Sequence, residues 1–509
     1  MERTGSISIV VLVVSIMCFN PTLISAQDAA RENAARCTAL MALNIRDTNV
    51  TSAVIIPAAG DLPEHCRVLG YVRPAIHFEV LLPTEAWNGR MYMTGCGGFC
   101  GRIINNRSIL GENYAASAMD SGHWGDAAWD ARWADHNRVA EADWAHRAVH
   151  ETARVTKELI EAFYGRPPDR SYFRGCSTGG RMALMEAIMY PDDFDGIICG
   201  APAIDYTALC ATYGSWLIQV NTNENGKNII RASDMKLIQD AVMSECDEVD
   251  GLKDGLIADP RYCEFDPGIL LKDTGGSGGG LTAEQVRTLK LWYDGPRNSK
   301  GKRLYPGGIT LGSESHWINW LFGASDDVGD EVYYWLSRDF LRFMAFEDDP
   351  GESFDVLDFD FDRDPPRLAF MGSLYNSDNP DLNDFRERGG KLLIYHGWGD
   401  GGIPPWKTIE YYEAVENRIG GREAAWNFVR LFLIPGMAHC GEAGYEFDPL
   451  SSLVDWVENG KAPDTFRVTV SDADGTIKWM RDLYPYPMRT AYTGKGDPAD
   501  PSSYECREP

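Results

Sequence analysis

The stretch of sequence that decides the fold is Ser171-Tyr172-Phe173-Arg174-Gly175-Cys176-Ser177-Thr178-Gly179. Its first four residues have the composition of a strand. The following run, Gly180–Tyr190, carries apolar side chains at helical spacing and stops before Pro191. A Gly-x-Ser-x-Gly motif therefore joins a strand to a helix. The two glycines permit a tight, strained turn that exposes the hydroxyl of Ser177 at the top of a sheet.

A strand, a strained serine turn and a helix in this order predict the α/β class and, within it, the α/β-hydrolase fold. Such a serine needs an acid and then a histidine further along the chain. Asp400 follows the apolar run 391–395, and His439 follows a second apolar run. We expect Ser177 to attack an ester carbonyl, His439 to accept the serine proton, and Asp400 to orient the imidazole. His396 is the rival histidine, and we expect it to be structural.

Two cysteines adjoin the candidate residues. Cys176 precedes Ser177, and Cys440 follows His439. If the serine and the histidine lie within hydrogen-bonding reach, the Cα atoms of these cysteines can approach to ~4.4–6.8 Å, the range of a disulfide. A Cys176–Cys440 bridge would fix the nucleophile against the base.

These motifs resemble the tannase and feruloyl esterase family. The resemblance is carried by four strings, Gly175–Arg181, Tyr190–Ile198, Tyr395–Asp400 and Pro435–Cys440, and runs from about residue 88 to about residue 461. Cysteines beside the serine and the histidine are the hallmark of that family. Membership implies a secreted carboxylic ester hydrolase acting on esters of aromatic acids, either small molecules or ester-decorated polymers. Feruloyl esters come first; galloyl esters and the mono-ester of terephthalate are alternatives, as is a catalytically silent binding protein on the same fold.

An early glycine-rich loop, Thr94–Gly101, follows a candidate strand. Hydrolases of this class stabilise the oxyanion with one backbone N–H from such a loop and one from the residue after the nucleophile. Thr178 supplies the second donor, and Gly97 or Gly98 is the candidate for the first. The alternative is a purely structural glycine turn. A phosphate-binding loop is disfavoured because Gly-Lys-Ser/Thr is lacking.

An acidic loop spans residues 247–256 and reads Asp-Glu-Val-Asp-Gly-Leu-Lys-Asp-Gly-Leu. Carboxylates separated by glycines can turn their oxygens inward, and hard oxygen ligands suit calcium, although the spacing is not that of an EF-hand. The family resemblance implies a structural Ca²⁺ site, with ligands from the side chains of Asp247, Asp250 and Asp254 and the carbonyls of Leu252 and Leu256. The alternative is a solvated acidic turn.

The separation of Ser177 from Asp400 exceeds what a few strand–helix units require. We therefore expect a catalytic domain formed by residues 27–205 and 367–509, with a lid inserted at 206–366 that contains the acidic loop.

An aromatic run at 331–346 lies within the expected lid. Phe340 and Phe343 are candidates for lining an apolar slot, although such aromatics more often form core. Arg338 and Arg342 could meet a substrate carboxylate or phenolate, with solvated surface as the alternative.

The N-terminus, residues 1–26, has the pattern of a signal peptide. Arg3 gives a weak basic region, the apolar core at 7–19 is too short to span a membrane, and Ser25-Ala26-Gln27 offers a cleavage point. Lipidation at Cys18 is a weaker alternative. We expect a secreted or periplasmic protein. The net charge of −27 argues against nucleic acid and against an anionic membrane surface as partners.

Twelve cysteines in an exported chain predict disulfides. After Cys176–Cys440, the pair Cys246–Cys263 is favoured because it flanks the acidic loop and agrees with the family resemblance, and Cys37–Cys66 comes third. Five cysteines remain unassigned from sequence: Cys96, Cys100, Cys199, Cys210 and Cys506.

Overall fold

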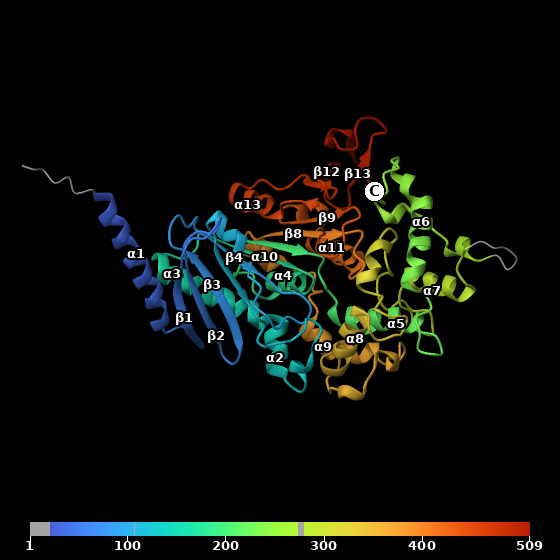
Figure 1. Cartoon of the computed structure of the whole chain (residues 1–509), viewed down its shortest axis with the longest axis horizontal. Coiled ribbons are helices and arrows are strands. Elements are labelled where there is room, and N and C mark those ends of the chain that lie inside the picture. The colour runs from blue at the N-terminus through green and yellow to red at the C-terminus, as the bar shows by residue number, and fades with distance from the viewer. Residues whose placement is uncertain (1–20, 106, 273–278) are drawn as a thin grey trace, which may run out of the picture.

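A single nine-stranded sheet forms the centre of the molecule (Figure 1). The computed structural model describes residues 21–105, 107–272 and 279–509. The strands run in the order β1-β2-β3-β5-β4-β6-β7-β8-β9; β1, β2, β3 and β5 pair antiparallel, and the pairs from β5 through β9 are parallel. Their bounds are β1 Thr48–Ile56, β2 His65–Val72, β3 Ile76–Pro83, β4 Arg90–Thr94, β5 Ala115–Met119, β6 Arg170–Cys176, β7 Gly196–Gly200, β8 Lys391–Gly397 and β9 Val429–Ile434.

Alternate residues of the central strands enter two different hydrophobic clusters. In β8, Leu392 and Ile394 join the larger cluster, whereas Leu393 and Tyr395 join the smaller one. Because successive strand side chains point to opposite faces, apolar residues at every position mean that both faces are covered. The sheet is therefore the middle layer of an α/β fold, as the sequence predicts.

Helices cover both faces of this sheet. Buried residues of α3, α4 and α11 join the larger cluster, and those of α13 join the smaller one. The helices outside the β7–β8 connection are α1 Pro21–Ala39, α2 Arg138–Ala142, α3 Ala148–Tyr164, α4 Thr178–Met189, α11 Trp406–Ile419, α12 Arg422–Trp426 and α13 Pro449–Asn459.

Most of the long connection between β7 and β8, residues 201–390, forms an insertion beside the carboxyl ends of the parallel strands, whereas its last helix lies by α4 (Figure 1). The expected lid, 206–366, lies within it. Its helices are α5 Gly214–Val220, α6 Met235–Cys246, α7 Ala283–Asp294, α8 Val332–Phe343, α9 Ala369–Tyr375 and α10 Asn383–Glu387. Helix α7 begins at a capping box, in which Thr282 and Gln285 exchange side-chain to backbone hydrogen bonds.

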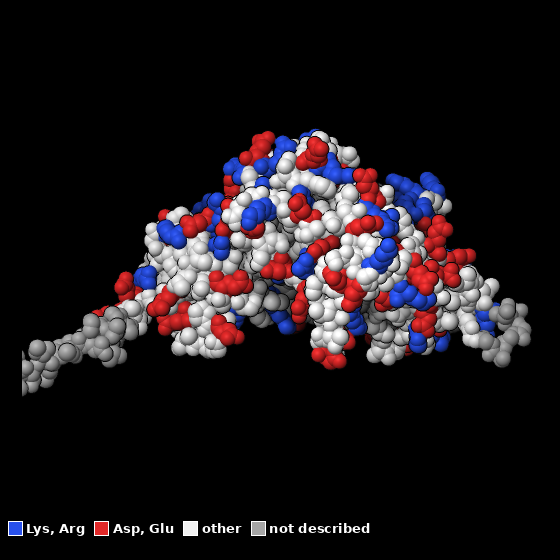
Figure 2. Space-filling view, turned by 90° about the horizontal axis from the view of Figure 1, so that it is seen from above, with Lys and Arg blue, Asp and Glu red and all other residues white. Residues whose placement is uncertain are grey.

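Two small antiparallel sheets complete the C-terminal part. One contains β10 Tyr445–Glu446, β11 Phe466–Ser471 and β12 Ile477–Leu483, and the other pairs β13 Arg489–Tyr492 with β14 Tyr504–Arg507. Within the described ranges, no helix is both long enough and apolar enough to cross a membrane. The expected signal peptide falls mostly on residues 1–20, outside the described residues. Acidic and basic side chains are scattered over the face shown in Figure 2.

Four disulfides link the described part of the chain. The three predicted bridges, Cys37–Cys66, Cys176–Cys440 and Cys246–Cys263, are all present. The fourth, Cys96–Cys100, joins two cysteines that the sequence left unassigned. Among the described residues, the free cysteines are Cys199 and Cys210, which are buried, and Cys506, which is exposed.

Candidate active site

Ser177 occupies a strained turn between β6 and α4. Its backbone has φ 64° and ψ −124°, a conformation that residues with a side chain rarely adopt. A Cβ atom at Gly175 would lie 2.1 Å from the carbonyl oxygen of Gly179, so only glycine fits there. The Ser177 N–H donates to the Gly200 carbonyl at 3.0 Å, which ties the turn to the end of β7. The sequence motif thus forms the expected nucleophile elbow.

Asp400 and His439 meet in the loops that follow β8 and β9. Asp400 follows β8 and is 1 % exposed. Its Oδ2 lies 2.8 Å from His439 Nδ1, and its Oδ1 accepts the N–H groups of Gly402 and Ile403 at 2.8 Å each. Nδ1 of His439 is thereby engaged, and Nε2 is the ring nitrogen that remains for proton transfer.

The carboxyl of Asp400 stays ionised despite its burial. Burial by itself would raise the pKa of Asp400, but the charge of His439 and hydrogen bonds from His396 and His439 outweigh it and hold that pKa well below its ordinary value. An ionised carboxylate can both orient the imidazole and stabilise its protonated form.

The rival histidine, His396, is fully buried and lines no part of the cleft that contains Ser177. Its Nδ1 pairs with Thr408 Oγ1 at 2.9 Å, and its Nε2 lies 2.8 Å from the Ile403 carbonyl and 3.2 Å from Asp400 Oδ2. His396 thus belongs to the packing around the acid, as expected from the sequence.

Ser177 and His439 line one cleft, and their neighbours are bonded to each other. The Cys176–Cys440 bridge has Cα atoms 5.8 Å apart and joins positions separated by 264 residues. The two loops that carry Ser177 and His439 are therefore cross-linked directly beside these two residues. His439 is also contacted by Trp320 of the insertion, edge-on, at 5.1 Å between ring centroids.

The glycine-rich loop lies against the start of α4. Thr178 Oγ1 donates to the Gly98 carbonyl at 2.7 Å, and the Cys96–Cys100 bridge closes the loop on itself. Gly98 has φ 57°, and a Cβ there would lie 2.3 Å from the Ala128 carbonyl, so this position requires glycine. Within the described residues, the N–H groups of Gly97 and Gly98 donate to no protein acceptor. They line the cleft together with Thr178 and are free to meet an oxyanion.

The cleft has a volume of about 410 Å³ and a mostly apolar lining. The insertion and the catalytic core both contribute to its wall. The apolar contributors are Ile104, Ala128, Trp129, Ala203, Leu209, Trp320, Val332, Leu336 and Ile403. Two tyrosines also line it, and each has its hydroxyl engaged by the protein: Tyr206 with Gly98 and Thr178, and Tyr333 with the Gly402 carbonyl. The cleft can therefore hold a flat apolar group next to Ser177.

The substrate-binding candidates from helix α8 lie elsewhere. Phe340 is buried among other aromatic rings and does not line the cleft, so it belongs to the hydrophobic core. Arg338, Arg342 and Phe343 line a second cavity of about 380 Å³, which shares Trp129 with the cleft. Sequence reasoning missed Trp129 and Trp320, because nothing local marks either as facing Ser177.

In the acidic loop, Asp250 and Asp254 lie beside Arg481, whereas Lys253 of the loop itself pairs with Glu248. Asp247 Oδ1 accepts the N–H groups of residues 254, 255 and 256, and Asp254 Oδ2 pairs with Arg481 at 2.7 Å. Burial raises the pKa of Asp254 to about 6, with Arg481 opposing and the neighbouring carboxylates adding to the rise; burial also raises the pKa of Asp250.

Most backbone carbonyls of the acidic loop accept no hydrogen bond from the described residues. Within the described residues, the carbonyl oxygens of Leu252 and Leu256 accept no hydrogen bond. Three partly buried carboxylates opposed by one arginine, together with two free carbonyl oxygens, form a donor set that fits a hard divalent cation. The residues named from the sequence thus suit calcium chemically.

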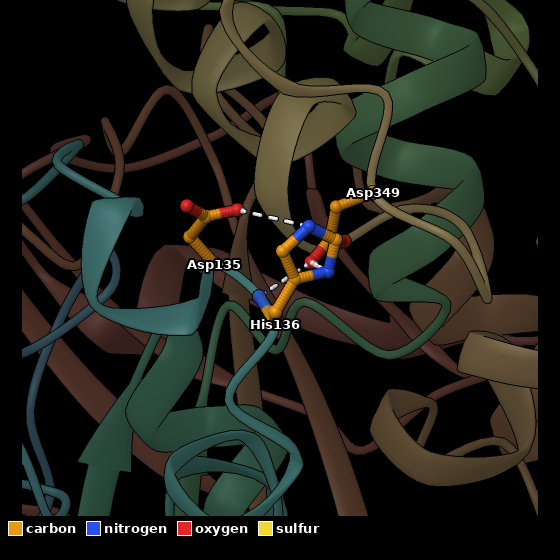
Figure 3. A group of neighbouring side chains, drawn as sticks. All are labelled: Asp135, His136 and Asp349. Atoms are coloured by element: carbon orange, nitrogen blue, oxygen red, sulfur yellow. Dashed lines mark hydrogen bonds and ion pairs between the residues drawn. The ribbon is translucent and has the colours of Figure 1, made fainter.

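A separate cluster, Asp135, His136 and Asp349, brings three ligand-type side chains close together (Figure 3). Asp349 Oδ2 accepts the backbone N–H of His136 at 2.8 Å and lies 3.7 Å from its Nδ1, whereas Asp135 faces Nε2 at 3.9 Å. The two carboxylates thus lie near different ring nitrogens of His136, at distances longer than a hydrogen bond. His136 and Asp135 are exposed at the surface.

Comparison with known proteins identifies relatives along nearly the whole chain. The family model described as tannase and feruloyl esterase matches residues 61–507. Feruloyl esterase B of Aspergillus niger is 31% identical, covering 91% of this chain and 90% of its own. The mono(2-hydroxyethyl) terephthalate hydrolase of Piscinibacter sakaiensis is 31% identical, covering 89% and 86%. The crystal structure of feruloyl esterase B from Aspergillus oryzae superposes with a TM-score of 0.84 at 27% identity, covering 93% of this chain and all of that one. The α/β-hydrolase fold, the serine elbow and these relatives together show that the chain is a carboxylic ester hydrolase of the tannase and feruloyl esterase family.

Proposed function

We propose that this protein hydrolyses esters of hydroxycinnamic acids through an acyl-enzyme on Ser177. The observation that carries the proposal is the apolar cleft that contains both Ser177 and His439, with His439 oriented by a buried, ionised Asp400. The volume and the apolar walls of this cleft suit an aromatic acyl group.

The first half of the reaction forms the acyl-enzyme. Ser177 Oγ attacks the ester carbonyl while His439 Nε2 takes the hydroxyl proton. The carbonyl oxygen becomes an oxyanion, for which the N–H of Thr178 and that of Gly97 or Gly98 are the proposed donors. When the tetrahedral intermediate collapses, the C–O bond to the alcohol breaks and His439 returns its proton to the leaving oxygen. Asp400 remains ionised throughout.

The second half releases the acid. Water replaces the alcohol in the cleft, gives a proton to His439 Nε2, and attacks the acyl carbonyl. The bond to Ser177 Oγ then breaks, the serine regains its proton from His439, and the aromatic acid leaves. Each proton that His439 accepts is thus returned, and the enzyme emerges unchanged.

The lining of the cleft favours a hydroxycinnamoyl group over the two alternative acyl groups. No arginine or lysine lies among its lining residues, so the carboxylate of a terephthalate mono-ester would meet no cation there. A galloyl ring carries three hydroxyls, whereas the tyrosine hydroxyls of the cleft already bond to the protein. Burying such groups without partners costs affinity.

Side-by-side rates test this choice. We expect kcat/KM for methyl ferulate to exceed that for methyl gallate and for mono(2-hydroxyethyl) terephthalate. Ser177→Ala should abolish turnover of all three esters while the circular dichroism spectrum is retained. A preference for the terephthalate mono-ester would contradict the inference that the cleft disfavours an acyl group with a carboxylate.

We further infer that the chain is exported and binds one structural Ca²⁺. The pattern of residues 1–26 and the four disulfides support an oxidising compartment outside the cytosol. The side chains of Asp247, Asp250 and Asp254 and the carbonyls of Leu252 and Leu256 would hold the ion. Calcium would stabilise the insertion, since the serine mechanism requires no metal.

A further inference from the structure

Two side-chain hydroxyls that the mechanism above does not use converge on the glycine-rich loop. Thr178 Oγ1 donates to the Gly98 carbonyl at 2.7 Å. The Tyr206 hydroxyl lies 3.3 Å from Thr178 Oγ1 and 3.4 Å from the same carbonyl oxygen. Both side chains are buried. A single backbone oxygen of the loop is therefore held by two hydroxyl groups that are shielded from solvent.

The number of protons in this group determines how its hydrogen bonds run. A threonine or tyrosine hydroxyl donates one proton and can also accept. Thr178 Oγ1 is the closer of the two to the Gly98 carbonyl oxygen, so its proton makes that bond. Tyr206 then donates to Thr178 Oγ1 or to the carbonyl oxygen, and either bond holds the same three groups together. Such hydrogen bonds are stronger in a buried, low-dielectric setting than in water.

The bond from Thr178 orients the peptide group that follows Gly98. A trans peptide group is planar, with its C=O and its N–H on opposite sides. Thr178 holds the C=O of this group, and the N–H of the same group, from Phe99, donates to the Ala128 carbonyl at 2.6 Å. The peptide group after Gly98 is therefore fixed at both ends.

The peptide group that precedes Gly98 is held as well. The N–H of Cys100 donates to the Gly97 carbonyl at 3.0 Å, and the Cys96–Cys100 bridge closes the same turn. The N–H of Gly98 belongs to this peptide group and points away from that carbonyl. Within the described residues, no backbone hydrogen bond fixes the peptide group before Gly97. Gly98, rather than Gly97, is thus the glycine whose N–H has a fixed direction.

Tyr206 connects this arrangement to the insertion. It lies near the start of residues 201–390, and its ring centroid is 5.7 Å from that of Phe340 on α8 and 6.3 Å from that of Phe99 in the glycine-rich loop. Phe99 and Phe340 also stack on each other at 6.4 Å. The three rings pack the loop against the insertion, and the Tyr206 hydroxyl extends this contact to the Gly98 carbonyl.

We propose that the hydroxyls of Thr178 and Tyr206 are positioning groups for the oxyanion, which hold the Gly98 peptide so that its N–H and that of Thr178 meet the same oxygen. Thr178 would then serve both halves of the oxyanion hole, one through its backbone and the other through its side chain. The inference rests on the oxyanion step of the proposed function but not on the identity of the acyl group, since every ester passes through the same kind of charged intermediate. The two hydroxyls would stabilise the transition state and contribute little to substrate binding.

Three variants test the hydroxyls one at a time. Thr178→Val and Tyr206→Phe each delete one hydroxyl at nearly constant shape, whereas Thr178→Ser keeps it. With p-nitrophenyl acetate as substrate, kcat should fall about 10–100-fold in Thr178→Val, which loses the short bond, and about 3–10-fold in Tyr206→Phe. KM should change by less than about twofold, because the hydroxyls act on the transition state. Thr178→Ser should recover most of the activity that Thr178→Val loses.

Tyr411→Phe is the matched control. Tyr411 is a buried tyrosine on α11 whose hydroxyl also donates to a backbone carbonyl, that of Asn379 at 3.2 Å. It lines none of the described cavities. The loss of this hydroxyl should leave kcat unchanged. Circular dichroism and melting temperatures of all the variants establish that each one is folded at the assay temperature.

Binding of a transition-state analogue separates positioning from a general loss of structure. An aryl trifluoromethyl ketone adds to Ser177 and forms a hemiketal whose oxyanion resembles that of the intermediate. Its inhibition constant should rise in Thr178→Val and in Tyr206→Phe by about the factor by which kcat/KM falls. Unchanged kcat in both variants would overturn the proposal, and so would a fall in kcat with an unchanged inhibition constant. If the wild type cleaves p-nitrophenyl acetate but not methyl ferulate, the proposed acyl preference fails while the positioning test still stands.

Discussion

The bridge between Cys176 and Cys440 should matter for catalysis as well as for overall stability. Replacing both cysteines by alanine removes a cross-link over 264 residues. In the chain-entropy model this costs roughly 5–6 kcal/mol of stability. The same change also frees the loops that carry Ser177 and His439 from each other. A displacement of about 1 Å between reacting groups can lower a rate by about 10²-fold.

The Cys37–Cys66 bridge provides the matched control. It spans 29 residues near the N-terminus, and the same model gives roughly 3–4 kcal/mol for its loss. Both double-alanine variants should therefore melt below the wild type. At a temperature well under both melting points, kcat on methyl ferulate should fall 10-fold or more only when Cys176 and Cys440 are replaced. Equal kcat values for the two variants would refute the positional role of the bridge, whatever their melting temperatures.

Three further predictions concern single groups. Asp400→Asn should lower kcat about 10³–10⁴-fold with little change in fold, because a neutral amide cannot stabilise the His439 cation; a loss below tenfold would contradict the role of the acid. Burial raises the pKa of Glu314 from 4.5 to about 7, so the folded state favours the protonated form. Its contribution to stability is complete below pH 4.5 and is lost as pH rises through 7, by roughly 3 kcal/mol. The difference in melting temperature between Glu314→Gln and the wild type should therefore grow in favour of the variant as the pH rises from 4.5 to above 7. A difference that does not change with pH would contradict the raised pKa of Glu314. Removal of calcium by a chelator should lower the melting temperature of the wild type but not that of Asp247→Asn. Equal shifts in the two proteins, or no shift in the wild type, would count against bound calcium.

The serine elbow could be predicted from sequence because its determinants are local. Gly175, Ser177 and Gly179 lie within five residues, and the strained turn follows from that spacing. Asp400 and His439 could be named because parallel strands bring their carboxyl ends to one edge of a sheet, and each residue lies in the loop after a strand.

The wall of the cleft could not be predicted in the same way. Trp129 and Trp320 reach Ser177 through long-range packing, and neither sits in a motif. The composition of helix α8 made it a candidate for lining the substrate pocket. Composition does not indicate how the helix is rotated about its own axis. Leu336 and Arg338 are two positions apart, which is about 200° around a helix, so one meets the cleft and the other the neighbouring cavity. Only the packing of the insertion fixes that rotation.

Covalent labelling tests the central claim most directly, namely that Ser177 is a nucleophile activated by His439. The wild-type protein, treated with an organophosphate ester and digested, should carry a single adduct on the peptide that contains Ser177. His439→Ala should label far more slowly, and Ser177→Ala should not label at that peptide at all. An adduct on a different residue, or labelling of the Ser177 peptide at an unchanged rate in His439→Ala, would contradict the account.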